Sequence, residues 1–190
     1  MLMRMRFFER WMVVLVLMNG LALVGLGAAE FRVDKARSKV TVGVKATGDD
    51  FTALLEDYRA DILVDDTTHQ PTNAVFSWDF KDLKTGKDKR DKAMLEWMEA
   101  PRLSRATFTF QGFERKGETN YALGVMELHG IKKSMSFPVV VEREGEQMSI
   151  RGRAKLDHQD YGLKIIRMLL LFKVDPNVEI GFELKGKLVK

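Results

Sequence analysis

The most informative pattern in the chain is an alternation of apolar and polar residues in two runs joined by His129-Gly130. Residues 124–141 have the sequence GVMELHGIKKSMSFPVVV, in which apolar side chains recur at every second position within each run. A period of two is typical of half-buried β-strands rather than of helices. The pattern therefore predicts a β-hairpin. Its inner face carries Met126, Leu128, Met135, Phe137, Val139 and Val141.

The same alternation recurs on both sides of this hairpin. Turn residues such as Lys116-Gly117, Glu144-Gly145-Glu146 and Pro176-Asn177 separate several of the segments. With the two hairpin strands, the additional strands are predicted at 38–46, 58–64, 74–80, 106–110, 148–156 and 178–184. Their expected inward residues include Val40, Val42, Val44, Tyr58, Ile62, Phe76, Trp78, Phe80, Phe108, Phe110, Ile180 and Phe182.

Two segments depart from the period of two. Between Asp88 and Glu99 the apolar residues follow a helical spacing, with Asp88 as a candidate N-cap and Pro101 just beyond, which predicts one amphipathic helix. Residues 163–174 contain no turn residue and fit either a short helix or a buried strand; a short helix or irregular lid is the preferred interpretation. The apolar residues of the first segment are Ala93, Met94, Trp97 and Met98.

Eight single-faced strands, one helix and no alternation of strands with helices favour an all-β antiparallel barrel or sandwich. A closed barrel removes exposed strand edges. With eight strands, its interior can hold a small ligand or be filled by side chains. The many aromatic residues on the inner face fit a packed core as well as a ligand cavity, and the pattern alone leaves both open.

The first 29 residues form a separate segment. Arg4, Arg6 and Arg10 precede an apolar run, which ends in Gly27-Ala28-Ala29. This order is typical of a secretory signal peptide. Because the run approaches the ~20 residues that span a bilayer, an uncleaved N-terminal anchor is the alternative. We expect a periplasmic or secreted domain over residues 30–190, close to the membrane if the anchor is retained.

Charge and composition narrow the function. The formal net charge is +4, and a leader with three arginines and one glutamate leaves only +2 on the remainder. Lysine and arginine are interspersed with acidic residues, so no basic patch indicates nucleic-acid binding. With no cysteine, the exported domain must be stabilised by its core rather than by disulfides.

Candidate catalytic and metal sites are weak. The three histidines, His69, His129 and His158, lack a short ligand spacing, so no metal site is predicted. Asp157-His158 resembles a fragment of acid–base machinery, but no serine lies in a nucleophile-elbow pattern. Residues 181–187 have the spacing of a phosphate loop, yet Leu188 replaces its Ser/Thr and the segment lies within a predicted strand. No catalytic residue and no cofactor are predicted.

A series of short motifs, in order along the chain, resembles the YceI-like, polyisoprenoid-binding family of exported bacterial proteins. The resemblance covers the chain from about Phe31 to its C-terminus. The matching residues are Val33-Asp34 with Ser38, Trp78-Asp79 through Leu83 to Thr85, Arg90-Asp91, Thr107-Phe108-Thr109-Phe110, residues 124–130 with Phe137-Pro138, and Asp160-Tyr161-Gly162-Leu163.

The resemblance implies a lipocalin-like barrel that encloses a long isoprenoid or similar amphiphilic lipid in an apolar tunnel. This sequence has Arg37, Ala46 and Ala93 where the family pattern usually has histidine, and Arg105-Ala106 replaces a tyrosine-proline pair. These departures fall on the polar groups that would meet a ligand's head. Lipid binding is therefore a firmer expectation than polyisoprenoid binding.

The predicted function is a non-enzymatic, exported binding protein for a long apolar ligand, because burial of apolar area needs only a dry lining. A filled structural barrel and a lipid-acting enzyme are the alternatives, and a homodimer is left open. Arg90-Asp91 is interpreted either as a tie between helix and barrel or as a head-group contact. The predicted lining consists of the inward strand residues named above, except Val141, together with Met94, Trp97 and Met98 from the helix.

Overall fold

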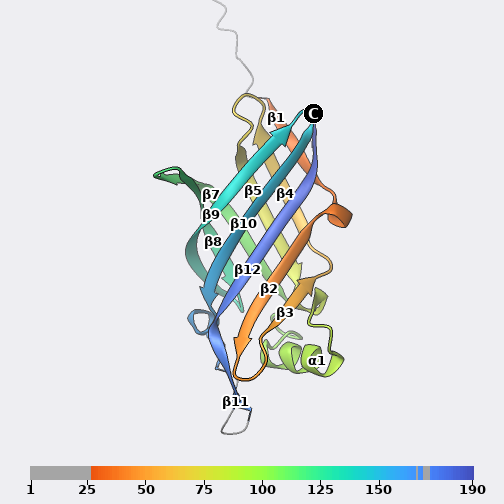
Figure 1. Ribbon diagram of the computed structural model, residues 1–190, viewed down its shortest axis with the longest axis vertical. Helices are drawn as coiled ribbons and strands as arrows, with labels where there is room; N and C mark the ends of the chain where they lie inside the picture. Colours follow the sequence, from red (N-terminus) through yellow and green to blue (C-terminus); the bar gives the residue numbers. More distant parts are fainter. Residues whose placement is uncertain (1–26, 166, 169–171) are drawn as a thin grey trace, which may run out of the picture.

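The alternating segments form the wall of a β-barrel, and an α-helix packs across one of its ends (Figure 1). The computed structural model describes residues 27–165, 167–168 and 172–190. The strands are β1 (Ala28–Val33), β2 (Lys39–Ala46), β3 (Phe51–Leu55), β4 (Arg59–Asp65), β5 (Pro71–Asp79), β6 (Leu83–Lys84), β7 (Arg105–Lys116), β8 (Thr119–Leu128), β9 (Ile131–Glu144), β10 (Gln147–Asp157), β11 (Arg167–Met168) and β12 (Phe172–Val189). The helix α1 spans Asp88–Trp97, and 3₁₀ turns span Lys35–Arg37, Phe80–Asp82 and His158–Tyr161.

The sheet closes because the last strand pairs with the first. β12 pairs antiparallel with β1, with Phe31 opposite Leu188, and its earlier residues pair with β2. β1 and β2 are thus two halves of one strand, separated by the turn at Lys35–Arg37, and both lie beside β12. β3 and β4 form the neighbouring strand of the barrel in the same manner, since β3 pairs with β2 and β4 pairs with β1. The result is the closed, eight-stranded antiparallel barrel that the sequence predicts.

The central hairpin is confirmed. β8 and β9 pair antiparallel, with Gly124 opposite Met135. His129 and Gly130 have φ values of 51° and 75°, so both turn residues are left-handed. Two left-handed residues are what a two-residue hairpin turn with the natural strand twist requires. The turn aligns the alternation of the two strands, so their apolar residues face the same side.

Four strands were not predicted: β1, β3, β6 and the two-residue β11. β3 is only five residues long and follows a run of polar residues, and β6 has only two residues. β1 was missed because Ala28 and Ala29 were assigned to the end of the leader, whereas they pair with β4 and Ala29 is buried. The rest of the predicted leader lies outside the described residues. Among the described residues, no helix has the length and apolar character needed to cross a bilayer.

The helix prediction is confirmed at Asp88–Trp97, with two corrections nearby. The N-cap is Lys87 rather than Asp88, and it makes no side-chain cap. In the segment 163–174 the predicted short helix is wrong: its described part contains β11 and the start of β12, which pair with each other. The predicted strand 74–80 ends at Asp79, and Phe80 begins a 3₁₀ turn with its side chain buried.

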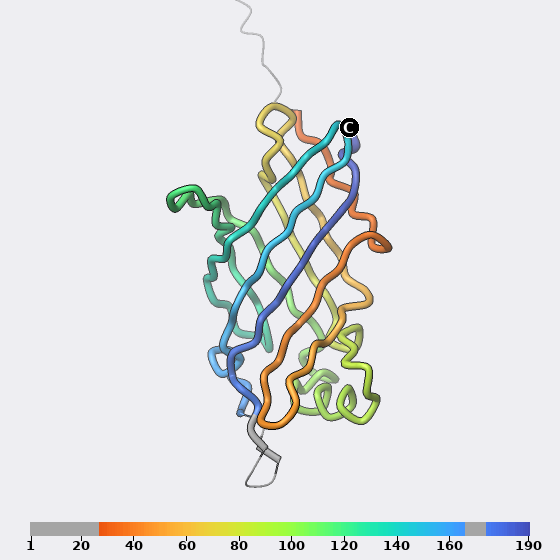
Figure 2. The backbone as a smooth tube through the Cα atoms, in the orientation of Figure 1, coloured from red at the N-terminus to blue at the C-terminus, as the bar shows by residue number. Residues whose placement is uncertain are grey.

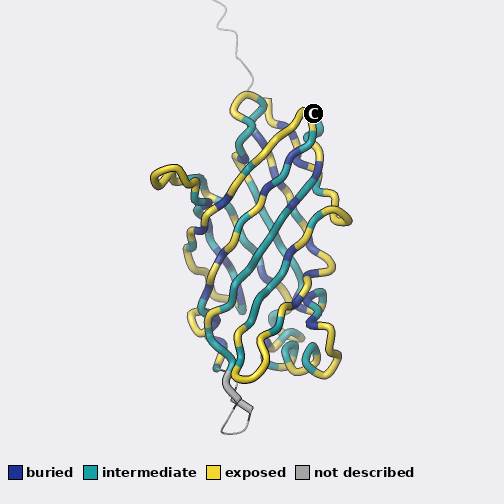
Figure 3. The backbone as a smooth tube through the Cα atoms, viewed as in Figure 1, coloured by how far each residue is buried: buried dark blue, intermediate teal, exposed yellow. Residues whose placement is uncertain are grey.

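The buried residues form two clusters, and buried positions occur along the length of the barrel (Figure 3). The first described residues and the C-terminus lie together at one end, which we call the terminal end, and α1 lies at the opposite, helix end (Figure 2). Phe31 and Val64, at most 1% exposed, belong to the cluster that reaches the terminal end. Phe80, Met98 and Tyr161 belong to the cluster at the helix end.

Candidate ligand-binding cavity

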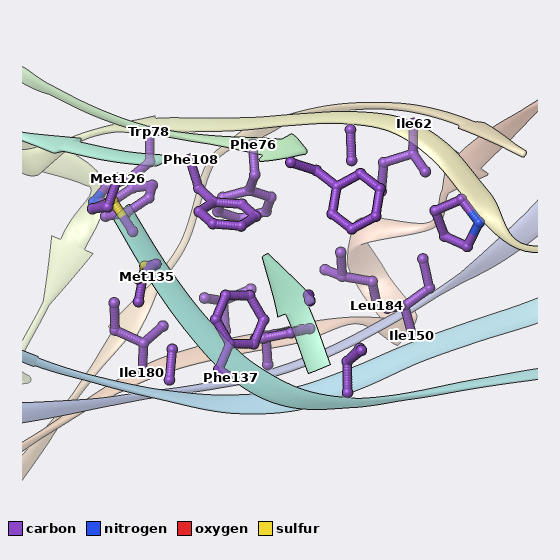
Figure 4. Close-up of a pocket in the computed structure, with 18 of the residues that line it drawn as sticks. Ile62, Phe76, Trp78, Phe108, Met126, Met135, Phe137, Ile150, Ile180 and Leu184 are labelled. Atoms are coloured by element: carbon purple, nitrogen blue, oxygen red, sulfur yellow. The ribbon is translucent and has the colours of Figure 1, made fainter. Parts of the chain in front are cut away.

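The middle of the barrel encloses a narrow apolar space of about 120 Å³ (Figure 4). Aromatic rings from opposite walls point into it, with Phe76 and Phe108 on one side and Phe137 on the other. We call this space the aromatic channel. Apart from the indole N–H of Trp78, the lining side chains are apolar, so a ligand here would gain mainly from burial.

Two inward-facing glycines make room for the rings of this channel. A Cβ added at Gly124 would lie 2.5 Å from Phe108 Cε2, and one at Gly152 would lie 2.7 Å from Phe182 Cζ. The ring of Phe108 therefore occupies the space that a side chain at Gly124 would need, and the ring of Phe182 does the same at Gly152. Phe137 lies between them, with ring centroids 5.3 Å from Phe108 and 5.8 Å from Phe182, which are normal aromatic packing distances.

A wider space of about 580 Å³ lies between the channel and α1. We call it the helix chamber. It shares lining residues with the aromatic channel, so the two spaces are adjoining parts of one interior. The shared residues are Val42, Trp78, Leu83, Met126 and Ile180.

One face of α1 forms a wall of the helix chamber. Arg90, Ala93, Met94 and Trp97 all line it, and their spacing of three or four residues places them along a single side of the helix. The indole Nε1 of Trp97 donates a 2.8 Å hydrogen bond to the carbonyl oxygen of Lys164. This bond ties the end of α1 to the segment that follows the last 3₁₀ turn.

At the start of α1, a polar group closes one side of the chamber. Thr85 donates to Asp91 Oδ1 from its backbone nitrogen at 2.9 Å and from its hydroxyl at 2.5 Å. Burial acts to raise the pKa of Asp91, but these hydrogen bonds outweigh it and the pKa is lowered. Arg90 Nη2 donates to the Thr85 carbonyl oxygen at 2.9 Å. Asp91 thus remains an anion that holds the loop before the helix.

On another part of the chamber wall lies His158, which is 2% exposed. Its Nδ1 is 3.3 Å from the Leu163 carbonyl oxygen, which can only accept, so Nδ1 carries the proton. Burial lowers the pKa of His158, and the ring is neutral near pH 7. Trp97 packs against it edge to face, with centroids 4.9 Å apart.

The structure places 19 of the 20 predicted lining residues on one or both spaces. Tyr58 is the exception: it is buried and stacks on Phe76, with centroids 4.9 Å apart. Some of the lining residues that were not predicted lie on the unpredicted β3 and β6 or at polar positions, and others lie on the predicted strands. They include Phe51, Ala53, Leu55, Leu83, Thr85, Arg90, His158 and Leu163, while Ile150, Ala154 and Leu184 continue alternations already recognised.

Two departures from the family pattern lie on the chamber wall. Ala46 and Ala93 both line the helix chamber, so the chamber is more apolar here than histidines would make it.

The histidines other than His158 lie away from the chamber: His129 is in the hairpin turn, and His69 is in the turn between β4 and β5. In the part of the chain that the structure describes, no cluster of three or more His, Asp or Glu could hold a metal ion.

A comparison with protein families agrees with this architecture. The YceI-like domain matches residues 31–186, which is most of the chain. The chain belongs to the YceI-like family. The matched segment runs from β1 to β12 and so includes every residue that lines the two spaces. A search of curated proteins finds no match.

Three solved structures share the fold at low sequence identity. Burkholderia cenocepacia BcnA is 19% identical, with a TM-score of 0.72, over 82% of this chain and all of BcnA. A polyisoprenoid-binding domain from Saccharophagus degradans is 16% identical, with a TM-score of 0.64, over 86% of this chain and 99% of that domain. The YceI protein of Campylobacter jejuni is 17% identical, with a TM-score of 0.58, over 73% of this chain and 86% of its own. These similarities establish the YceI-like barrel.

Proposed function

We propose that this YceI-like barrel is a non-enzymatic binding protein that holds a long, mainly apolar ligand such as a polyisoprenoid or another amphiphilic lipid. The observation that carries the proposal is the interior itself, in which the aromatic channel and the helix chamber adjoin and are lined almost wholly by apolar side chains. The polyisoprenoid-binding domain from Saccharophagus degradans, which has the same fold, supports this ligand class.

The two alternative functions predict different interiors. A structural module with a filled barrel needs no space beyond that of a few waters, whereas the helix chamber measures about 580 Å³. An enzyme that acts on a lipid needs an acid–base pair at the ligand. Of the titratable groups on the chamber, His158 bonds a carbonyl, and Asp49 lies 3.8 Å from Lys87 Nζ. These contacts join no acid to a base among the described side chains of the chamber, which favours binding as the function.

Mass spectrometry of the native, purified protein tests the proposal. We expect a lipid with a long hydrocarbon chain to remain bound under native conditions and to be released by solvent extraction. The native mass also distinguishes a monomer from a homodimer. A protein that carries no lipid, and takes up none from extracts of its own cells, would contradict the proposal.

A pair of variants makes the test specific to the chamber. Ala93 lines the helix chamber, whereas Glu96, one turn further along α1, is exposed and does not line it. We expect Ala93→Phe to reduce the amount of bound lipid by filling part of the chamber, and Glu96→Phe to leave it unchanged. Equal occupancy in both variants would place the ligand elsewhere on the protein.

We propose further that the protein is exported and acts in the periplasm or outside the cell, near the membrane if its leader is retained. The basic start and apolar run of residues 1–29 support this. Cell fractionation and the intact mass of the exported chain test it. We expect a mass lower by roughly the leader if the segment is cleaved; recovery in the cytosol would contradict export.

A further inference from the structure

Arg90 is the one charged side chain on the helix chamber, within the described residues, that has no ion-pair partner. The other charged lining residue, Asp49, lies 3.8 Å from Lys87 Nζ and points toward solvent. His158 is neutral, and Thr85 carries no charge. Arg90 is partly buried, and its attraction to Asp91 acts without an ion-pair contact, so the loss of solvating water is only partly compensated. Arg90 therefore leaves a charge that a ligand could neutralise.

The guanidinium of Arg90 is held in position without using all of its donors. Its carbon lies 3.9 Å from the ring centroid of Phe51, and Nη2 donates to the Thr85 carbonyl oxygen. Its Nε is buried and has no hydrogen-bond partner. Stacking and one hydrogen bond fix the plane of the group, and the remaining donors keep the fork geometry that fits a carboxylate or phosphate.

The neighbouring acid does not neutralise Arg90 through a direct bond. Asp91 directs Oδ1 to the backbone nitrogen and hydroxyl of Thr85, and it is not a lining residue of the chamber. Adjacent residues on a helix point in different directions, so Arg90 faces the chamber while Asp91 faces the loop. Both residues bond Thr85, Arg90 at its carbonyl oxygen and Asp91 at its nitrogen and hydroxyl, and no hydrogen bond joins Arg90 directly to Asp91.

We propose that Arg90 binds the oxyanion head, a carboxylate or phosphate, of a single-chain amphiphile whose hydrocarbon chain lies in the helix chamber. This inference rests on the proposed function and narrows it from an apolar ligand to an acidic one. From Arg90, the hydrocarbon chain of the ligand has an apolar path along Ala93, Met94 and Trp97 and then past Met126 toward the aromatic channel. The head group of the ligand thus lies at the polar part of the chamber wall, beside Arg90, and its hydrocarbon chain lies against the apolar part.

Three probes that share one hydrocarbon chain and differ in the head group test this inference: dodecanoate, dodecyl phosphate and dodecanol. The binding of each is measured by displacement of the neutral dye N-phenyl-1-naphthylamine. We expect the wild type to bind both acids about tenfold or more tightly than the alcohol near neutral pH, since a hydrogen bond to a charged group contributes about that much. Arg90→Gln should abolish the difference by weakening the binding of both acids more than that of dodecanol. Arg90→Lys should restore part of it.

A matched control separates Arg90 from a general effect of charge. Arg102 is exposed, bonds Glu99 beyond the end of α1 and does not line the chamber, so Arg102→Gln should keep the full preference for the acids. Equal binding of acid and alcohol by the wild type would overturn the inference, as would an equal loss of both in Arg90→Gln or an equal effect of Arg102→Gln.

Two further outcomes separate this inference from the proposed function. Inorganic phosphate at millimolar concentration should not displace bound dodecanoate, because the head alone lacks the burial of the chain; displacement would indicate a site for the free anion and overturn the inference. If acid and alcohol bind equally, the proposed function stands and only the inference fails. If neither dye nor probe binds, the proposed function itself fails.

Discussion

The aromatic channel and the helix chamber are built from the same strands, yet they differ in how tightly they are packed. In the channel, rings fill the space above two glycines and leave about 120 Å³. In the chamber, one wall is formed by α1 with Ala93, Met94 and Trp97, and a space of about 580 Å³ remains. The aromatic channel is thus packed like a hydrophobic core, whereas the helix chamber has room for a ligand. Stability should therefore depend on the channel and the terminal end, and binding on the chamber.

The largest effect on stability is expected at the terminal end. Phe31 is 1% exposed, and its ring covers Gly186. Phe31→Ala should lower the free energy of unfolding by about 3–5 kcal/mol, because it leaves a cavity that the barrel cannot refill. Met94→Ala, on the partly exposed chamber wall, should cost roughly 1 kcal/mol. Urea unfolding of both variants measures the contrast, and equal costs would contradict it.

A smaller effect should come from the glycines of the channel. A Cβ at Gly124 would also lie 2.5 Å from the Thr109 carbonyl oxygen, so either ring or backbone must shift. Gly124→Ala should cost about 1–3 kcal/mol, as overpacking usually does. Gly43→Ala is the matched control on β2, where the added Cβ would meet only the Glu179 carbonyl oxygen at 3.7 Å. Thermal unfolding should rank the two variants in that order; the reverse order would mean that the rings of the channel move freely.

The smallest effect is a pH dependence that originates in the chamber. Because burial lowers the pKa of His158, the unfolded chain takes up a proton near the ordinary histidine value, ~6.5, before the folded chain does. The free energy of unfolding should therefore be highest above that pH and should fall as the pH drops below it. His158→Asn, which can still donate to the Leu163 carbonyl oxygen, should flatten this slope.

Chemical unfolding of wild type and variant at several pH values between neutral and mildly acidic measures the difference. Carboxylates such as Asp65, whose pKa is lowered by hydrogen bonds from Thr68, contribute only at lower pH and leave this window to histidine. Identical slopes for the two proteins would show that His158 takes up its proton equally readily in the folded state.

Much of the barrel could be predicted from the sequence because strand alternation is a local property. Each inward residue of the β8–β9 hairpin follows from the period of two together with the His129-Gly130 turn. β3 could not be predicted in the same way, since five residues give too few repeats of the period. The segment 163–174 was misassigned because a continuous apolar run has no period, and only its pairing in β11 and β12 decides its conformation.

The candidate site was predictable only in its apolar part. Phe137 and Phe182 were expected to face inward, but their spacing across the barrel depends on Gly152, whose role becomes visible only when β10 lies between β9 and β12. Thr85, Arg90 and His158 come from three separate segments of the chain. The sequence offered two interpretations of Arg90, and it gave no indication that His158 would lie at the same chamber.

By itself, the alternation in the sequence determined an antiparallel all-β fold with an apolar interior, because it specifies which face of each strand is buried, and the family resemblance selected a barrel over a sandwich. Only the tertiary structure decided how that interior is divided. Ring packing over Gly124 and Gly152 narrows one half, and the placement of α1 across the other opens a chamber with Arg90 on its wall. Volumes and unpaired charges depend on side chains that meet across the barrel, and such meetings are set by the register of distant strands rather than by any local pattern.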